Sequence, residues 1–563
     1  MMKFFQSSKR RVKVLFALLI IGAGGLSIAA SSGDQYFQIS KNLDIFATLF
    51  KELNVYYVDE TEPGELMKNG IDAMLNSLDP YTVYYPESKI EDFKFMTTGQ
   101  YGGIGALIRT VEDHVIIAEP YKGFPAYKAD LRAGDKILEV DGKSAKGKSS
   151  SEISKVLKGQ PDSELTLKVK RPGVEEPFDV KLTRMEVKIE DVPHYGVVGS
   201  NTGYIKLSSF TETASKNVKA AFKELKDEKE IESLILDLRG NGGGLLREAV
   251  NIVNIFVEKG QEVVYTKGKV SDWDRSHRTI NNPMDLNIPL VVLIDDNSAS
   301  ASEIVAGTLQ DLDRAVVVGQ RSFGKGLVQQ TKSLSYNSKL KLTVAKYYTP
   351  SGRCIQKLDY AKKDDEGNAT EIPDSLITEY KTRNGRPVFD GDGIRPDIHV
   401  EMEKGSPILG SLLSNNLIFD YATHFRNDVD SIPQPEAFQF TANYYQEFKT
   451  WLEDKEYDYT TRTEKLLEKL EEATKKERYH EHLNDEFENF KAEIQHNKQE
   501  DLMTFKDQIA EVVGNEVVSR YYYQQGRIQY NLQFDRELDS ALVTLNNPER
   551  YQEILAVPTA QKQ

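Results

Sequence analysis

Hydrophobic and polar residues follow two different periods along this chain, and the two periods predict where strands and helices lie. Short apolar runs typical of buried strands occur at Ser233–Leu238, Val291–Ile294 and Ala315–Val318. The first run is followed by apolar residues at helical spacing over Leu246–Val257, and the second by a similar pattern over Ala301–Leu309. Buried strands that alternate with amphipathic helices predict an α/β core.

The pattern changes on either side of this core. The stretch before it alternates short strands, such as Lys136–Val140, with one helix near Ser151–Leu157, and a still earlier stretch is purely helical. The last part is rich in Glu, Lys and Tyr and carries apolar residues at helical spacing. We therefore expect a multidomain α/β protein with these parts: a leader (1–33), an N-terminal helical domain (34–97), a strand-rich domain (98–187), the α/β core (188–403) and a C-terminal helical extension (404–563).

Residues 1–33 have the pattern of an export signal. Lys9, Arg10, Arg11 and Lys13 precede an uncharged stretch over Val14–Gly33. The small residues near its end are spaced like a cleavage site, yet the uncharged stretch is also near the length that spans a bilayer. A cleaved signal and an uncleaved anchor are both open, and in either case we expect the bulk of the chain in the periplasm or cell envelope.

Composition and charge narrow the classes of function. The 563 residues carry a formal net charge of −15, which argues against a nucleic-acid partner. A single cysteine, Cys354, excludes a disulfide within the chain and is expected to be a spectator. The eight histidines are scattered without ligand spacing, so we expect no metal and no organic cofactor.

The candidate chemistry lies where the predicted strands of the core end. Ser300 falls between a strand and a helix, beside exposed amides and the positive end of a helix dipole. Lys325 lies in a glycine-bearing loop after the next strand, so the two form a candidate Ser/Lys dyad. Ser300 with Glu303 also fits a capping box, which is the commoner role of such a serine.

Three consecutive glycines, Gly242, Gly243 and Gly244, follow the first buried strand. Glycine at this density indicates tight turning or a close approach of backbone to another group. An amide from this loop, together with the amide of Ala301, would suit an oxyanion.

The motifs DLRGNGGG, NSASASE and RSFGKGLVQ, in this order, resemble those of the C-terminal processing (tail-specific) serine proteases, a family with a crotonase-like βα core. Further motifs, SLDPY, GQYGGIG, YYTPSGR and GIRPD, extend the resemblance over roughly residues 40–402. The resemblance implies Ser300 as nucleophile, Lys325 as general base and Gln329 as the residue that orients the lysine. It also implies the amides of Gly244 and Ala301 as the oxyanion hole, and the choice of Gly244 among the three glycines is its least specific part.

These residue types suit the chemistry. A lysine can act as a base when its pKa falls from about 10.4 towards neutrality, and burial has that effect because it disfavours the charged form. Gln329 lies four residues after Lys325, on the same side of an extended or helical segment. A neutral amide there can hold the amine without raising its pKa as a carboxylate would.

Residues 98–187 resemble a bacterial PDZ domain. In such a domain a glycine-rich loop offers amides to a C-terminal carboxylate, and the peptide adds as a strand beside it. The resemblance implies a substrate site formed by Gly102, Gly103, Ile104, Gly105 and Leu107. Asp130 departs from the pattern, because the family usually has glycine there, and the departure puts the local turn in question.

We therefore predict an exported serine endopeptidase that recognises free C-terminal tails of protein substrates. Two alternatives stay open: a Ser/His hydrolase that uses His277, in a segment (SDWDRSHR) expected to be a surface loop, and a catalytically silent PDZ scaffold. Residues 404–563 are left with four roles: oligomerisation, binding of an adaptor, covering the active site, or packing.

Overall fold

A computed structural model describes residues 36–478 and 480–556. The predicted export signal at residues 1–33 lies outside them. The chain forms two compact units, Met1–Tyr84 and Tyr85–Gln563. Among the described residues, no helix combines the length and the apolar character needed to cross a membrane.

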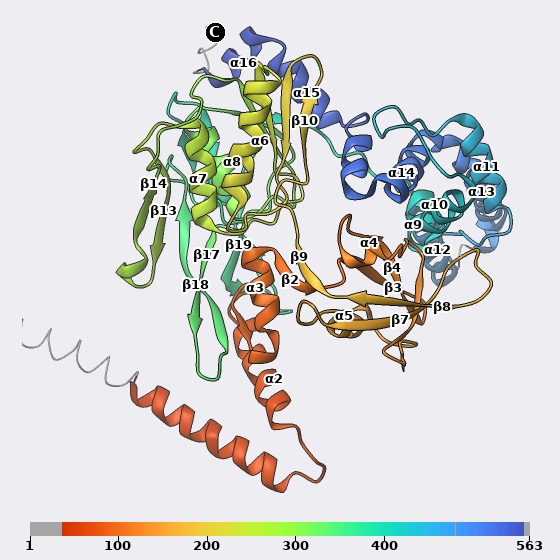
Figure 1. Ribbon diagram of the computed structural model, residues 1–563, viewed down its shortest axis with the longest axis horizontal. Helices are drawn as coiled ribbons and strands as arrows, with labels where there is room; N and C mark the ends of the chain where they lie inside the picture. Colours follow the sequence, from red (N-terminus) through yellow and green to blue (C-terminus); the bar gives the residue numbers. More distant parts are fainter. Residues whose placement is uncertain (1–35, 479, 557–563) are drawn as a thin grey trace, which may run out of the picture. The chain divides into compact units, whose positions relative to one another are not determined.

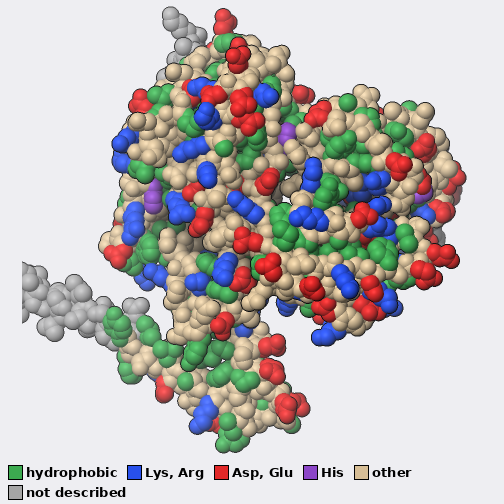
Figure 2. Space-filling model, viewed as in Figure 1, with side chains coloured by type: hydrophobic (Ala, Val, Ile, Leu, Met, Phe, Trp, Pro, Cys, Tyr) green, Lys and Arg blue, Asp and Glu red, His purple; other side chains and the backbone are tan. Residues whose placement is uncertain are grey.

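The N-terminal unit contains a helix over residues 36–56 and α2 over Pro63–Asn76, and the predicted helical domain (34–97) also includes the short strand β1 (Val83–Tyr85). The Asp79 carboxylate accepts hydrogen bonds from the amides of Tyr81 and Thr82, both at 2.8 Å, and this explains the aspartate of the SLDPY motif as a turn former. Many large apolar side chains of the helix over 36–56 are exposed. Figure 2 shows hydrophobic side chains gathered on the surface of this unit, whereas acidic and basic side chains are interspersed over the other.

The strand-rich domain holds an antiparallel sheet in the order β3-β4-β5-β7-β8, with β6 paired to β5. Its elements are β3 (Ala106–Val111), β4 (His114–Pro120), β5 (Lys136–Val140), β6 (Lys143–Ser144), β7 (Glu164–Lys170), β8 (Phe178–Thr183), α4 (Pro125–Lys128) and α5 (Ser150–Leu157). Burial alternates along β7, where Leu165, Leu167 and Val169 point into the core. The sheet has β3 at one edge, beside α5.

The main sheet lies in the second unit in the order β10-β11-β12-β15-β16-β23. Its strands are β10 (His194–Val198), β11 (Thr202–Lys206), β12 (Ser233–Asp237), β15 (Leu290–Ile294), β16 (Val316–Gly319) and β23 (Ile398–His399). All neighbours from β11 to β23 are parallel, so the carboxyl ends of β12, β15 and β16 meet at one edge. One face is covered by α6 (Ala214–Glu228), α7 (Leu246–Phe256) and α8 (Ala301–Asp311), shown together in Figure 1. The predicted multidomain α/β fold is confirmed.

The opposite face of the main sheet is covered by the end of the chain. Leu538, Ala541 and Leu545 of α15 (Arg536–Leu545) and Tyr551 and Leu555 of α16 (Pro548–Leu555) form one core with the sheet. That core includes inward-facing residues of β11, β12, β15 and β16. The sequence-based boundary places these helices with the extension from residue 404, whereas the structure packs them as a layer of the α/β core.

The rest of the C-terminal part is a helical domain with its own aromatic-rich core. Its helices are α9 (Pro407–Ser414), α10 (Leu417–Asp428), α11 (Ala442–Leu452), α12 (Arg462–Glu477), α13 (His480–Thr504) and α14 (Lys506–Asn531). It contacts the strand-rich domain, where Arg527 pairs with Glu119 at 3.1 Å.

A second, antiparallel sheet stands beside the main one. β13 (Glu262–Gly268) pairs with β14 (Arg275–Arg278) and with β18 (Lys339–Tyr348), which also pairs with β17 (Leu327–Ser333). The prediction of a surface loop over residues 271–278 was wrong. A 3-10 turn over Ser271–Trp273 leads into β14, because sheet pairing with β13 satisfies the backbone of this polar segment.

Candidate active site

Ser300 lies where the sequence places it, between β15 and the N-terminus of α8. Its backbone has φ +57° and ψ −111°, a conformation that residues with a side chain rarely adopt. Strain of this kind is held only where the surrounding structure imposes it, and it is typical of nucleophile turns. The half-buried Ser300 is thus presented at the carboxyl edge of the main sheet.

The glycine loop after β12 lies directly against this turn. A Cβ on Gly243 would come within 2.7 Å of Ser300 Cβ and 2.9 Å of the Ala301 amide nitrogen, and Gly243 has φ +101°. The Gly243 amide itself donates to Asn241 Oδ1 at 2.9 Å, so it is already used. In the described part of the chain, no hydrogen bond is donated by the amides of Gly244 and Ala301. These two amides remain the predicted oxyanion donors.

Asn241, which the sequence analysis did not single out, ties the glycine loop to the serine turn. It is fully buried, and its side-chain amide donates to Leu207 O at 2.8 Å. Its backbone carbonyl oxygen accepts hydrogen bonds from the Ala299 amide at 3.0 Å and from Ser302 Oγ at 2.8 Å. From the sequence, an asparagine between glycines is predicted to be a turn residue. Only the tertiary contacts show that Asn241 also connects the glycine loop to the serine turn.

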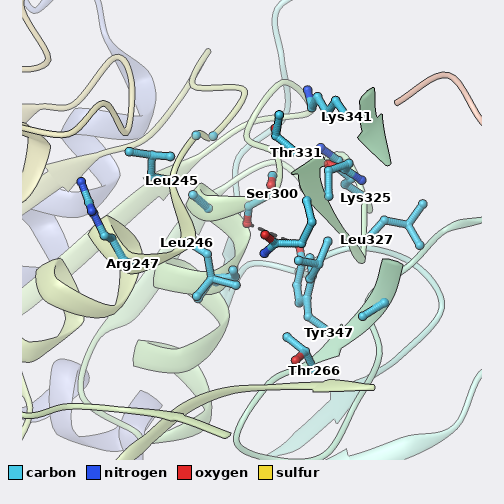
Figure 3. Close-up of a pocket in the computed structure, with 18 of the residues that line it drawn as sticks. Leu245, Leu246, Arg247, Thr266, Ser300, Lys325, Leu327, Thr331, Lys341 and Tyr347 are labelled. Carbon is cyan, nitrogen blue, oxygen red and sulfur yellow. Dashed lines mark hydrogen bonds between the residues drawn. The ribbon is translucent and has the colours of Figure 1, made fainter. Parts of the chain in front are cut away.

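Lys325 lies in the loop after β16, at the same edge of the sheet. Gly324 and Gly326 flank it with φ +81° and +63°, values that favour glycine. A Cβ at either glycine would approach the segment at Gln356 and Lys357 to within 2.6 Å, so the loop is packed closely there. The half-buried lysine side chain points into the cavity that Ser300 also lines (Figure 3).

Glu303 joins the serine turn to the lysine loop. Its fully buried carboxylate accepts from the amides of Ser300 at 2.8 Å and Lys325 at 3.0 Å. The remaining donors are the Gly324 amide at 2.6 Å, Ser322 Oγ at 2.7 Å and Tyr347 OH at 3.2 Å. Burial raises the pKa of Glu303, and these hydrogen bonds oppose the increase. The capping role expected of Glu303 is present, but its larger role is to bind both candidate loops.

The cavity has a volume of about 750 Å³ and lies between the two sheets. Ser300, Ala301, Lys325, Gln329 and the three glycines of 242–244 all line it. Ile304, Leu246, Leu327 and Ala345 provide an apolar part of its wall. The structure therefore brings together every catalytic residue predicted from the sequence, with enough room for an extended peptide.

Gln329 lies on β17, with its side chain lining the same cavity as Lys325. Its amide nitrogen donates to Thr343 Oγ1 on the neighbouring strand at 3.2 Å. This bond fixes the side-chain amide on the cavity wall. The orientation of Lys325 by Gln329, which the resemblance implies, stays a prediction.

His277, the base of the alternative hydrolase, also lines the cavity, from β14. Burial and the nearby positive charge of Arg275 lower the pKa of His277. The described hydrogen bonds of Ser300 do not include one to this ring.

The predicted substrate residues of the strand-rich domain divide into two groups. Gly102 and Gly103 belong to β2 (Gln100–Gly103), which pairs with β9 (Met185–Lys188), so they are part of a ladder rather than of a loop. Ile104 is 2% exposed and its side chain lies in the domain core. Leu107, by contrast, is 52% exposed on the edge strand β3.

Ile104 and Gly105 still suit the binding of a carboxylate through their backbone. Their carbonyl oxygens accept from Ala126 and Tyr121, both at 2.8 Å, and no described hydrogen bond is donated by their amides. Asp130 takes φ +55°, in the left-handed region that favours glycine, and its side chain binds Arg132 and Arg171. The departure from the family pattern therefore leaves the turn intact.

Within the described ranges 36–478 and 480–556, no group of three or more His, Cys, Asp or Glu side chains is arranged so that it could hold a metal ion. Burial raises the pKa of the Cys354 thiol, so it is a poor nucleophile.

Comparison with known proteins agrees with this architecture. Three family models match: "PDZ domain" over residues 102–182, "Peptidase family S41" over 201–364 and "Probable PDZ-protease, C-terminal helical domain" over 408–545. The carboxy-terminal-processing protease of Bartonella bacilliformis is 39% identical over 321 residues, which are 56% of this chain and 73% of the relative. Carboxy-terminal processing protease CtpA of Bacillus subtilis is 32% identical over 364 residues, 62% of this chain and 76% of the relative.

Among solved structures, the photosystem II D1 C-terminal processing protease is 28% identical and aligns with 63% of this chain and 92% of its own, with a TM-score of 0.34. The alignments cover 73% and 76% of these two relatives, and this chain itself matches both the PDZ and the peptidase models. The chain therefore belongs to the carboxy-terminal processing proteases, PDZ-bearing serine proteases of peptidase family S41.

Proposed function

We propose that this protease cleaves peptide bonds with a Ser300/Lys325 dyad and selects substrates by their free C-terminal tails. The observation that carries the dyad is the shared carboxylate of Glu303, which holds the amides of Ser300 and Lys325 at 2.8 and 3.0 Å. Two loops that follow different strands are thus fixed to one buried group, and their side chains line one cavity.

In the proposed reaction, Ser300 Oγ attacks the scissile carbonyl carbon while its proton passes to the neutral amine of Lys325. The negative charge on the carbonyl oxygen is stabilised by the amides of Gly244 and Ala301. The Lys325 ammonium then protonates the leaving amine, which leaves an ester on Ser300. A water molecule gives a proton to Lys325 as it attacks this ester, and the Lys325 ammonium then returns the proton to Ser300 Oγ as the ester bond breaks, which restores both residues.

The test compares three single variants of the full-length protein on a quenched fluorescent peptide. Ser300→Ala and Lys325→Ala should each abolish turnover, and the double variant should be no worse than either, because the two residues act as one unit. His277→Ala is the matched control and should retain turnover. Near-normal activity of Lys325→Ala with loss in His277→Ala would favour the Ser/His hydrolase.

Tail recognition is proposed for the PDZ domain. The amides of Ile104 and Gly105 suit a terminal carboxylate, and a peptide can extend the sheet at the edge strand β3. Leu107 and Val156, 52% and 47% exposed, offer apolar contacts on β3 and α5.

An unfolded substrate with a free apolar tail should therefore be cleaved faster than the same substrate with an amidated tail. The loss of a charged hydrogen bond of roughly 1.5–3 kcal/mol corresponds to about ten- to a hundredfold in binding. Equal cleavage of the two substrates would remove tail recognition and leave the dyad standing. Tight binding of the free tail without cleavage would instead support the silent scaffold.

We also propose that the protein is exported and acts in the periplasm or cell envelope. The basic and then uncharged pattern of residues 1–33 supports export, and the exposed apolar side chains of the helix over 36–56 support attachment to a membrane or to a second copy. Fusion of residues 1–60 to alkaline phosphatase tests export, because the reporter is active only outside the cytoplasm. An inactive fusion would contradict the proposal.

A further inference from the structure

The last helices of the chain bring two carboxylates to the catalytic edge of the main sheet. Asp535 is the N-cap of α15 and accepts from the Leu538 amide at 2.9 Å, while Glu537 lies in the first turn. Leu538 and Ala541 of the same helix are buried against the sheet, so the helix and its first turn are held firmly. The two acids are therefore placed by packing and not by the active-site loops themselves.

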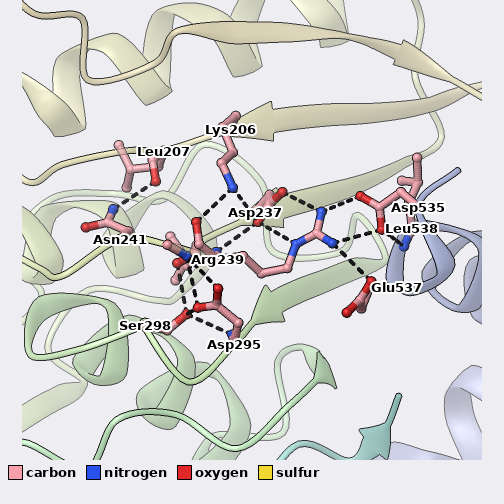
Figure 4. Close-up of polar contacts among 12 residues, drawn as sticks. Lys206, Leu207, Asp237, Arg239, Asn241, Asp295, Ser298, Asp535, Glu537 and Leu538 are labelled. Atoms are coloured by element: carbon pink, nitrogen blue, oxygen red, sulfur yellow. Dashed lines mark hydrogen bonds and ion pairs between the residues drawn. The ribbon is translucent and has the colours of Figure 1, made fainter. Parts of the chain in front are cut away.

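Both carboxylates contact Arg239, which lies two residues after the end of β12 and leads into the glycine loop. Asp535 accepts from both terminal nitrogens of the guanidinium, at 2.8 and 2.6 Å, and Glu537 accepts from one of them at 3.3 Å (Figure 4). Asp237 binds the opposite side of the same guanidinium, at 3.1 and 2.7 Å. Burial alone would raise the pKa of Asp237, but Arg239 and Lys206 outweigh it and hold that pKa far below its usual range.

Glu537 also reaches the loop that carries the base. Its second oxygen accepts from Gln320 Nε2 at 2.7 Å, and Gln320 is the first residue after β16. Gln320 also donates to Val400 O at 2.8 Å, so the start of the Lys325 loop is held between the sheet edge and α15. One side chain of the C-terminal segment thus touches the first residues of two catalytic loops.

The serine turn is connected to the same network. The amide of Gly240, next to Arg239, donates to both oxygens of Asp295 at 2.9 and 3.0 Å. Asp295 in turn accepts from Ser298 Oγ at 3.0 Å, two residues before Ser300. Figure 4 shows these contacts continuing from Arg239 to Asp295 and Ser298.

From this arrangement we infer that Asp535 and Glu537 are positioning residues of the protease, which keep the oxyanion loop and the base loop in register. They touch no substrate; they act through Arg239 and Gln320. The inference rests on the proposed roles of Gly244, Ser300 and Lys325. It gives residues 532–555 a part in catalysis, which none of the four roles left open for the extension describes.

The loss of this contact should affect the chemical step more than substrate binding. An error of about 1 Å in the position of catalytic groups can lower the rate by about a hundredfold. Asp535→Asn and Glu537→Gln keep the shape of each side chain while removing its charge, so the packing of α15 should persist. We expect the full-length double variant to lose roughly ten- to a hundredfold in kcat, with KM for a short peptide changed less than threefold.

The matched control is Asp539→Asn, an exposed acid in the first turn of the same helix. It changes the charge near the helix N-terminus to the same degree as either single variant but touches neither loop. It should retain wild-type kcat, while each of Asp535→Asn and Glu537→Gln should lower kcat by less than the double variant.

The experiment measures kcat and KM below the unfolding transition of every variant, together with the rate at which an organophosphonate probe labels Ser300. Reduced labelling with unchanged KM supports the inference. Wild-type kcat in the folded double variant overturns it, as does an equal loss in Asp539→Asn. Should the double variant not fold, the two single variants decide by the same criteria. Failure of the proposed dyad would appear separately, as activity retained by Ser300→Ala.

Discussion

Replacement of Glu303 by glutamine tests the central contact of the site. The carboxylate accepts hydrogen bonds from three backbone amides, those of Ser300, Gly324 and Lys325, and from two hydroxyl groups. A glutamine has one oxygen and one NH₂ group, so at least one backbone amide must face a donor. The best placement puts the NH₂ group on the side of Gly324 and Ser322, because a serine hydroxyl can also accept.

One buried amide without an acceptor costs about 1–3 kcal/mol, so we expect Glu303→Gln to lower the free energy of unfolding by about that amount. Activity should fall further, about ten- to a hundredfold in kcat at a temperature where the variant is folded, because the amides of both dyad residues depend on this group. Urea unfolding followed by fluorescence gives the first quantity and single-turnover cleavage of a peptide gives the second.

Asp311→Asn is the matched control, since Asp311 lies in the same helix and is buried, but pairs with Arg353 at 2.8 Å away from the cavity. This variant should lose stability and keep the kcat of its folded fraction. The reasoning would be refuted by a Glu303→Gln protein with wild-type kcat, or by equal losses of kcat in the two variants.

Two further predictions follow from the same edge of the sheet. Asp237→Asn should lower the free energy of unfolding by about 3–5 kcal/mol at pH 7. Because the folded-state pKa of Asp237 is lowered, this difference from wild type should be complete above the unfolded pKa of about 3.9 and should shrink only as pH falls through the folded pKa. Urea unfolding in which the difference already shrinks between pH 7 and pH 5 would contradict the assignment. Gly243→Ala should abolish turnover in the peptide assay, because its Cβ would lie 2.7 Å from Ala299 O and Ser300 Cβ. Gly240→Ala is the control and should stay active, because Gly240 also has a positive φ but a Cβ there would meet nothing within 4 Å. Similar activity of the two variants would argue against a close approach at Gly243.

Much of the local structure of this protein could be predicted from the sequence. The strands β12, β15 and β16 and the helices α7 and α8 lie within about two residues of their predicted bounds, because an apolar run or an amphipathic period reports directly on burial. Ser300 and Lys325 could be singled out because each follows a buried strand. The glycines around them mark turns that other residues cannot make.

Some predictions failed because the competing contact lies far away in the sequence. Gly102 and Gly103 resemble a loop, yet β2 pairs with β9, more than eighty residues further on. The segment 271–278 is polar throughout, yet its backbone completes a ladder with β13. Polar composition describes side chains, whereas pairing is decided by which backbone groups need partners.

The sequence by itself determined the elements, the glycine turns and the order of the catalytic motifs, because these depend on neighbours within a few positions along the chain. The tertiary structure decided that Glu303 binds two catalytic loops, that Asn241 joins the glycine loop to the serine turn, and that α15 closes the second face of the sheet. Arg239 and Asp535 are 296 positions apart. Their contact depends on how a whole helix buries its apolar face, and no local pattern records which sheet that face will meet.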